Sequence, residues 1–153
     1  MTTNPHYDLS LRQLESVLSM TQDPVSNMAN MSAVLFGGLT QVNWVGFYVR
    51  RGEELLLGPF QGKPACVRIA LGKGVCGTAA QTGQIQRVEN VHNFLGHIAC
   101  DSASQSEIVI PIFKEGRVWG VLDLDSPVLA RFTPQDQVFL EKAARLFEQK
   151  TAL

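Results

Sequence analysis

The sequence of 153 residues has no marked excess of charge of either sign and no long apolar run. Its 13 basic and 14 acidic residues give a formal net charge of −1, so no basic field exists to attract nucleic acid or an anionic membrane. No apolar stretch approaches the roughly 18 residues that a transmembrane helix requires. The first residues lack the charged and apolar segments of a secretory signal. We therefore expect a cytoplasmic protein that binds neither nucleic acid nor membrane.

Cysteine is also scarce, with only Cys66, Cys76 and Cys100. An odd number argues against a framework of structural disulfides, and cytoplasmic thiols normally stay reduced. A free cysteine is usually a small buried apolar residue, whereas a reactive one needs access and a means of lowering its pKa. Cys100 lies among small polar residues, close to His97, which favours a reactive thiol, although the neighbouring Asp101 works against a lower pKa.

The apolar fraction of 45% is enough for one hydrophobic core, so we expect a single domain over residues 1–153. Helices are expected at both ends of the chain. Apolar residues at helical spacing predict one over residues 7–19 and a second one after Asp23, which is a suitable N-cap. A further helix is expected after Thr133, because the sequence Thr-Pro-Gln-Asp matches a capping box.

Between these helices, β-branched and alternating segments predict strands, at residues 43–50, 54–60, 65–71, 85–91, 106–114 and 117–126. A short helix closed by Gly83 is expected between the third and fourth of them. The short connections favour antiparallel pairing, so the expected fold class is α+β, with the N- and C-terminal helices packed on one face of the sheet. Residues 91–106 are too apolar for a linker, and we expect them to form a folded lid over an active site.

Three carboxylates are expected to lie together. Asp123 and Asp125 are two residues apart on a strand, so both side chains project from one face. Glu107 begins the preceding strand, and a hairpin would bring it near the pair. Clustered carboxylates raise one another's pKa, so that one can keep the proton that a general acid needs. The alternative is that the two aspartates simply face solvent where the strand ends.

Aromatic residues alternate along the strand at residues 43–50. Trp44, Gly46 and Tyr48 share one face, while the aliphatic residues between them share the other and belong to the core. The aromatic face is either a pocket wall, in which Gly46 leaves room for a ligand, or ordinary packing.

Two further sequence patterns, one for a dinucleotide loop and one for a metal site, are only weak indications of function. The G-x-G-x-x-G sequence at residues 72–77 is typical of dinucleotide loops, but the remaining strands lack the alternating helices of a nucleotide-binding βαβ fold. The potential metal ligands His92, His97, Cys100 and Asp101 match no zinc spacing. We therefore expect neither a metal nor a cofactor.

Several of these segments together resemble one family. In chain order they are NWVGFYV, GPFQGKPAC, GKGVCGTA, VENVH, GHIACDSASQSEIVIPI and GVLDLDS. They are similar to the free methionine-R-sulfoxide reductases, which are GAF-type domains, and the resemblance extends from about Trp44 to Phe132. It implies a GAF-like fold and the reduction of free L-methionine (R)-S-oxide to L-methionine.

The resemblance implies a distinct role for each cysteine. Cys100 resembles the catalytic nucleophile, which becomes a sulfenic acid, and Cys66 resembles the resolving thiol that then forms a disulfide with it. Cys76 resembles a third cysteine that can join a later disulfide exchange. Thioredoxin would then reduce the disulfide. Because GAF domains often dimerise, a homodimer is also implied.

The resemblance also implies substrate-site roles for the acids and aromatic residues. We expect Asp123 to donate a proton to the sulfoxide oxygen and Glu107 and Asp125 to hold the substrate ammonium, although these assignments could be exchanged. Trp44 and Tyr48 would form the walls around the methyl-sulfoxide end.

Two alternatives remain. One is a non-catalytic GAF module that binds a small ligand or senses redox state, although such a module would not need three cysteines beside three acids. The other is a cysteine hydrolase that pairs Cys100 with His97 or His92.

Overall fold

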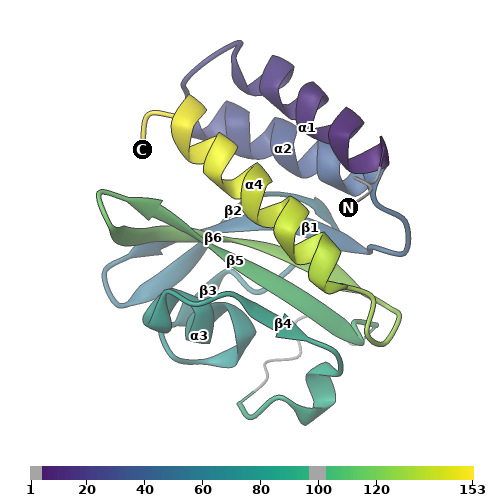
Figure 1. Cartoon of the computed structure of the whole chain (residues 1–153). Helices are drawn as coiled ribbons and strands as arrows, with labels where there is room; N and C mark the ends of the chain where they lie inside the picture. The colour runs from purple at the N-terminus through teal and green to yellow at the C-terminus, as the bar shows by residue number, and fades with distance from the viewer. Residues whose placement is uncertain (1–4, 97–102) are drawn as a thin grey trace.

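The computed structural model describes residues 5–96 and 103–153, which form one antiparallel sheet and four α-helices (Figure 1). The strands are β1 (Trp44–Arg51), β2 (Glu54–Gly62), β3 (Arg68–Ala70), β4 (Gln86–Val88), β5 (Ser106–Lys114) and β6 (Arg117–Ser126). Their order across the sheet is β3-β2-β1-β6-β5-β4. The helices are α1 (Pro5–Leu18), α2 (Pro24–Gly38), α3 (Gly74–Thr82) and α4 (Pro134–Lys150), with a short 3-10 helix η1 (Val91–Asn93).

The two faces of the sheet carry different helices. Helices α1, α2 and α4 lie on one face, and α3 lies on the other, near the edge strands β3 and β4 (Figure 1). The expected α+β class, with the terminal helices on one face of an antiparallel sheet, is therefore confirmed. Among the described residues, no helix is both long and apolar enough to cross a membrane.

Local capping fixes where two helices begin. The Asp23 carboxylate accepts a hydrogen bond from the Ser26 amide at 3.0 Å, and α2 starts at Pro24, directly after Asp23. At α4, the Thr133 hydroxyl accepts from the Asp136 amide at 3.1 Å, and the Asp136 carboxylate accepts from the Thr133 amide at 2.9 Å. Both caps satisfy amide groups that a helix leaves unpaired, and both predicted starts are confirmed.

The main hydrophobic core lies between the sheet and the three helices on its first face. The strand period of two directs Val45, Phe47 and Val49 of β1 into this core, as predicted. The Phe47 ring packs 5.0 Å from the Phe147 ring of α4, measured between centroids. Every second residue of the same strands therefore faces α3 instead, and this is where the polar side chains of the site lie.

Two predicted strands are shorter than expected. Of residues 65–71, only Arg68–Ala70 form a strand, and the Cys66 carbonyl before it accepts from a side chain, the Tyr48 hydroxyl. Of residues 85–91, only Gln86–Val88 form a strand. Asn90 ends the pairing there, because its side chain accepts from the His92 amide at 3.0 Å and caps η1.

The predicted lid over residues 91–106 is described only in part. It begins with η1, and the Gly96 carbonyl accepts from the Gly74 amide at 3.1 Å, which ties this segment to the start of α3. Three candidate residues of the lid, His97, Cys100 and Asp101, lie outside the described residues. Its role as a lid stays a prediction.

Candidate functional site

A pocket lies on the face of the sheet that carries α3, between this helix and strands β1, β5 and β6. Most of the predicted site residues line it together, namely Trp44, Tyr48, Cys76, Glu107, Asp123 and Asp125. They come from four elements that are separated in the sequence. Their chemical roles are not tested by this placement and stay predictions.

Strand register brings the three acids together. Glu107 of β5 pairs with Asp125 of β6, and Asp123 lies two residues further along the same strand, so all three side chains share a face. Glu107 is 7% exposed and Asp123 is 5% exposed, whereas Asp125 is half-buried. The alternative in which the two aspartates face solvent at a strand end is therefore wrong for Asp123.

Burial changes the acid–base properties of this cluster. Loss of solvation, and then the charge of Asp125, together raise the pKa of Asp123 from 3.8 to about 8. Burial, and then the charge of Asp123, also raises the pKa of Glu107 well above its ordinary value. The pair can therefore hold a proton at neutral pH and donate it to a bound oxygen.

Cys76 lies under the same cluster, on the buried side of α3. Its thiol donates a hydrogen bond to the Glu107 carboxylate, with 3.8 Å between Sγ and Oε2. Burial, followed by the charges of Asp123 and Glu107, raises the pKa of this thiol well above 9.0. Because the thiolate is the nucleophile, Cys76 is poorly suited to the first attack on a substrate.

The other described cysteine has a different environment. Cys66 is half-buried and disulfide-bonded, whereas Cys76 is a free thiol. The Cys66 segment borders the pocket, because the neighbouring Ala65 lines it. Cys66 is thus more accessible than Cys76, as thiol–disulfide exchange requires.

The aromatic wall is tied to the segment that carries Cys66. The Trp44 Nε1 group donates to the Lys63 carbonyl at 3.1 Å, and the Tyr48 hydroxyl donates to the Cys66 carbonyl at 2.8 Å. The Trp44 ring lies 6.0 Å from the Tyr48 ring and 5.2 Å from the Phe60 ring, measured between centroids. Burial, followed by the charge of Asp123, raises the pKa of Tyr48, so its hydroxyl stays protonated.

Gly46 lies beneath this wall. Contrary to the expectation, it does not leave space for a ligand. A Cβ atom at this position would lie 2.3 Å from the Phe60 Cβ and 2.7 Å from the Trp44 Cη2. The glycine therefore allows the indole ring and Phe60 to pack across the strand. The predicted wall exists, and the space beside Gly46 is filled by the wall itself.

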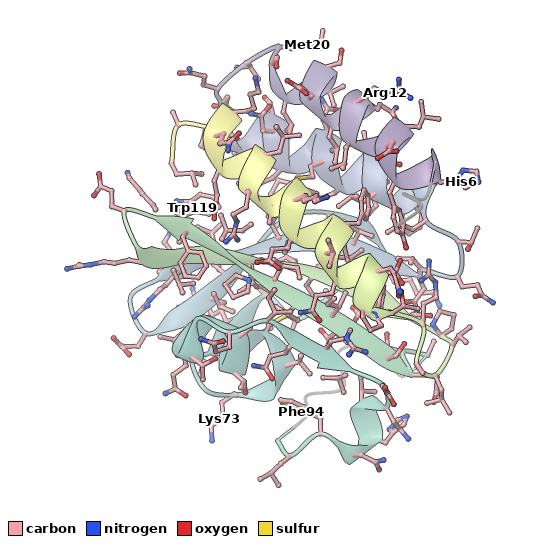
Figure 2. All side chains as sticks on the ribbon, viewed as in Figure 1. His6, Arg12, Met20, Lys73, Phe94 and Trp119 are labelled. Carbon is pink, nitrogen blue, oxygen red and sulfur yellow. The ribbon has the colours of Figure 1, made fainter. Side chains whose placement is uncertain are left out.

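Some pocket residues were not predicted from the sequence. Ser104 is buried and lines the pocket, and its hydroxyl has no hydrogen-bond partner among the described residues. Lys73, just before α3, also lines the pocket, and it is exposed. Figure 2 shows it on the α3 side of the sheet, directed away from the body of the protein. Only their positions, one in the predicted lid and one in the glycine-rich segment, could have suggested them.

The glycine-rich segment at residues 72–77 forms the turn into α3. The Gly72 amide donates to the Gly77 carbonyl at 2.8 Å, and the Gly77 amide donates to the Lys73 carbonyl at 3.0 Å. A Cβ atom on Gly77 would lie 2.5 Å from the Ala70 carbonyl oxygen. Since these amides donate to the backbone, they are not available to a pyrophosphate.

The comparison with known families now identifies the fold. Residues 13–150 match the GAF domain family, and the chain belongs to that family. Within it, the chain groups with the free methionine-R-sulfoxide reductases, as the following relatives show. The resemblance seen in the sequence is therefore confirmed.

The relatives match nearly the whole chain. The protein YtsP of Bacillus subtilis is 52% identical over 95% of this chain and 91% of its own length. The free methionine-R-sulfoxide reductase of Escherichia coli is 48% identical over 92% of this chain and 86% of its own length. The structure of reduced fRMsr of Staphylococcus aureus has a TM-score of 0.94 and 49% identity, and covers 99% of this chain and 100% of that chain. The same protein has also been solved in complex with its substrate, with a TM-score of 0.92.

Proposed function

We propose that this protein reduces free L-methionine (R)-S-oxide to L-methionine. The observation that carries the proposal is the pocket in which two buried carboxylates and the half-buried Asp125 face a wall formed by Trp44 and Tyr48. A free amino acid has both an ammonium group for the acids and an apolar end for the aromatic rings. The Escherichia coli relative that carries the name of this activity supports the assignment.

Two of the acids bind the substrate, and the third donates a proton. Glu107 and Asp125 hold the substrate ammonium, because a charged amine is stabilised by anionic partners. A methionine residue within a peptide lacks this amine, so the site selects the free amino acid. Asp123 donates the proton to the sulfoxide oxygen, since its raised pKa keeps it protonated at neutral pH.

The reaction begins with the Cys100 thiolate, whose role follows from the family resemblance. Its sulfur attacks the sulfoxide sulfur, and the oxygen, protonated by Asp123, passes to the cysteine. Methionine leaves reduced, and Cys100 becomes a sulfenic acid. Cys66 then attacks this sulfenic acid, so that water leaves and a disulfide closes.

Recycling restores the two thiols at the expense of a dithiol protein of the thioredoxin class. Exchange proceeds through a mixed disulfide and leaves the donor oxidised. The half-buried, disulfide-bonded state of Cys66 and the buried, free state of Cys76 support Cys66 as the resolving thiol. Cys76 then takes part only in a later thiol–disulfide exchange.

The geometry favours this function over a sensor module and over a hydrolase that uses His92, whereas a hydrolase that uses His97 concerns a residue outside the described ones. A module that only senses a small ligand has no need for protonated acids around a thiol. A hydrolase that uses His92 needs this residue beside the nucleophile, but His92 is exposed and is not among the described residues that line the pocket.

The proposal is tested with resolved free R- and S-sulfoxides and thioredoxin as the reductant, without a small thiol, and with methionine as the measured product. We expect the wild type to consume only the R form over many turnovers. Cys100→Ser should form no methionine, because the attacking sulfur is gone. Cys66→Ser should form about one equivalent and then stop, because the sulfenic acid is not resolved.

The controls separate chemistry from folding. Circular dichroism shows whether each variant is folded, and peptide-bound methionine sulfoxide tests the requirement for a free amine. Full multiple turnover by the Cys100→Ser variant with thioredoxin would end the proposal.

A further inference from the structure

Three potential metal ligands meet in the wall of the pocket, one from each of three elements. They are Cys76 of α3, Glu107 of β5 and Asp123 of β6, and one ligand atom from each lies within 4.8 Å of the others. The Cys76 Sγ and Glu107 Oε2 atoms are 3.8 Å apart. All three side chains are more than nine-tenths buried, so their positions are fixed by packing.

An unsatisfied atom within this cluster points to a missing ligand. The Asp123 Oδ1 atom is buried and has no hydrogen-bond partner among the described residues. Buried polar atoms of native proteins nearly always have a partner, and a carboxylate oxygen without one is costly. Because Asp123 also lines the pocket, a cation that entered there would lie beside this carboxylate.

The spacing of the three atoms suits a small tetrahedral ion. Bonds of about 2.3 Å to sulfur and about 2.0 Å to oxygen place tetrahedral ligands about 3.5 Å apart for S···O and about 3.3 Å apart for O···O. The observed distance between Cys76 Sγ and Glu107 Oε2, 3.8 Å, is slightly larger, and no other separation exceeds 4.8 Å. Small rotations of the side chains would therefore close them around one ion.

The ligand types select the ion. A thiolate with two carboxylates suits borderline-soft Zn²⁺ better than Mg²⁺ or Ca²⁺, which prefer a larger set of oxygen ligands. Three protein ligands leave a fourth position open, as in zinc sites that bind a further group. We propose that Cys76, Glu107 and Asp123 form a Zn²⁺ site whose open position faces the pocket.

The site would compete with the substrate, a consequence that rests on the proposed function. The ion would withdraw Glu107 and Asp123 from the amino acid and fill the space between them. The zinc-bound protein would therefore be an inactive form, and it would also hold Cys76 out of disulfide exchange.

Metal binding can be measured without any turnover. The variant Cys66→Ser/Cys100→Ser leaves Cys76 as the only thiol, and Co²⁺ serves as a probe because a bound thiolate gives it a charge-transfer absorption band. The ligands must release their protons to the ion, so the titration is made at mildly alkaline pH. We expect one equivalent of Co²⁺ to produce the band, Zn²⁺ to displace it and Mg²⁺ to leave it unchanged.

Further substitutions in this double variant test each ligand. Cys76→Ser should abolish the band, and Glu107→Gln and Asp123→Asn should each weaken binding by more than about tenfold, the lower end of the loss for removing even an outer partner of a metal site. Asp125→Asn is the matched control, since this acid lines the same pocket outside the cluster, and it should retain the band.

The outcomes that overturn the proposal are specific. Absence of the band in the double variant, or a band that survives Cys76→Ser, would show that the three residues do not form the site. If Cys76→Ser does not fold, equal Co²⁺ affinity of the Asp123→Asn and Asp125→Asn variants would lead to the same conclusion. Free methionine should weaken Co²⁺ binding, and a band that methionine leaves unchanged would count against the proposed substrate pocket and not against the metal site.

Discussion

Asp123 lies between two leucines that point into the main core, while its own side chain faces the pocket. The strand period of two produces this separation, because successive side chains leave opposite faces of β6. A substitution at Asp123 therefore changes the chemistry of the pocket and leaves the hydrophobic core untouched. The same holds for Asp125, which makes the two residues a matched pair for mutagenesis.

We expect Asp123→Asn to slow the chemical step by about 100-fold, the lower end of the contribution of a general acid. The amide keeps the shape of the protonated acid but is a far weaker acid, so the leaving oxygen gains no proton. The rate is measured in a single turnover, as methionine formed after rapid mixing with reduced enzyme.

Asp125→Asn is the control for this measurement. It should raise the substrate concentration needed for half-maximal rate and change the limiting rate much less, because Asp125 is expected to hold the ammonium. An unchanged single-turnover rate for Asp123→Asn would move the acid role to Glu107.

Among the elements, α4 is held at its first turn by a cluster far from the pocket. Asp136 is 3% exposed, and it caps α4, forms an ion pair with Arg131 at 2.8 Å and accepts a hydrogen bond from Tyr7 of α1. One carboxylate thus joins the first and last helices. Since both helices cover the core face of the sheet, this cluster affects stability and not the reaction.

We expect Thr133→Ala to lower the free energy of unfolding by about 1 kcal/mol, the usual loss for a helix N-cap. Asp136→Ala should cost more, about 3 kcal/mol, because it also leaves Arg131 without its buried partner. Urea unfolding measures both values, and Glu141→Ala, an exposed change on the same helix, should stay within about 0.5 kcal/mol of the wild type. Equal losses for the Thr133 and Asp136 variants would show that the ion pair contributes nothing.

These elements also show how far the sequence could be interpreted. Alternation and capping are local signals, so the pocket face of β1, the three acids and the starts of α2 and α4 could be predicted. The wall around Cys66 could not be predicted, because the Lys63 and Cys66 carbonyls accept hydrogen bonds from Trp44 and Tyr48, which are distant in the sequence. The same reason explains the roles of Gly46 and Ser104, which depend on neighbours that only the fold brings together.

At the scale of the whole molecule, the main hydrophobic core and the buried acids lie on opposite faces of the sheet, and a second apolar cluster lies on the side of the acids. The apolar core lies under α1, α2 and α4, whereas Glu107 and Asp123 are buried on the other face. Buried acids cost stability once they ionise, because ionised groups are poorly solvated there. Ionisation of the acids in the pocket therefore lowers the free energy of unfolding, and the apolar core on the opposite face compensates for this loss.

This cost should appear as a dependence of stability on pH in the metal-free protein. Folded Asp123 keeps its proton up to about pH 8, whereas the unfolded chain releases it near 3.8. The folded state thus binds more protons between these values, and the free energy of unfolding falls as the pH rises, by up to about 1.4 kcal/mol per pH unit for one group. Urea unfolding across this window, in the presence of a chelator, measures the slope.

The slope should become smaller in Asp123→Asn and stay unchanged in Glu141→Gln, an exposed control. Some slope should persist in the first variant, because the pKa of Glu107 is raised as well. Identical slopes for the wild type and Asp123→Asn would show that Asp123 ionises normally in the folded protein.

The two tryptophans lie in opposite halves of the molecule. Trp44 belongs to the pocket wall, and its indole donates to the backbone of the segment that carries Cys66. Trp119 packs against the main hydrophobic core, and its ring lies 6.2 Å from that of Phe147, measured between centroids (Figure 2). The protein thus contains two tryptophan fluorophores, one beside the pocket and one beside the main core. Replacing either by phenylalanine should let tryptophan fluorescence follow ligand binding and unfolding separately.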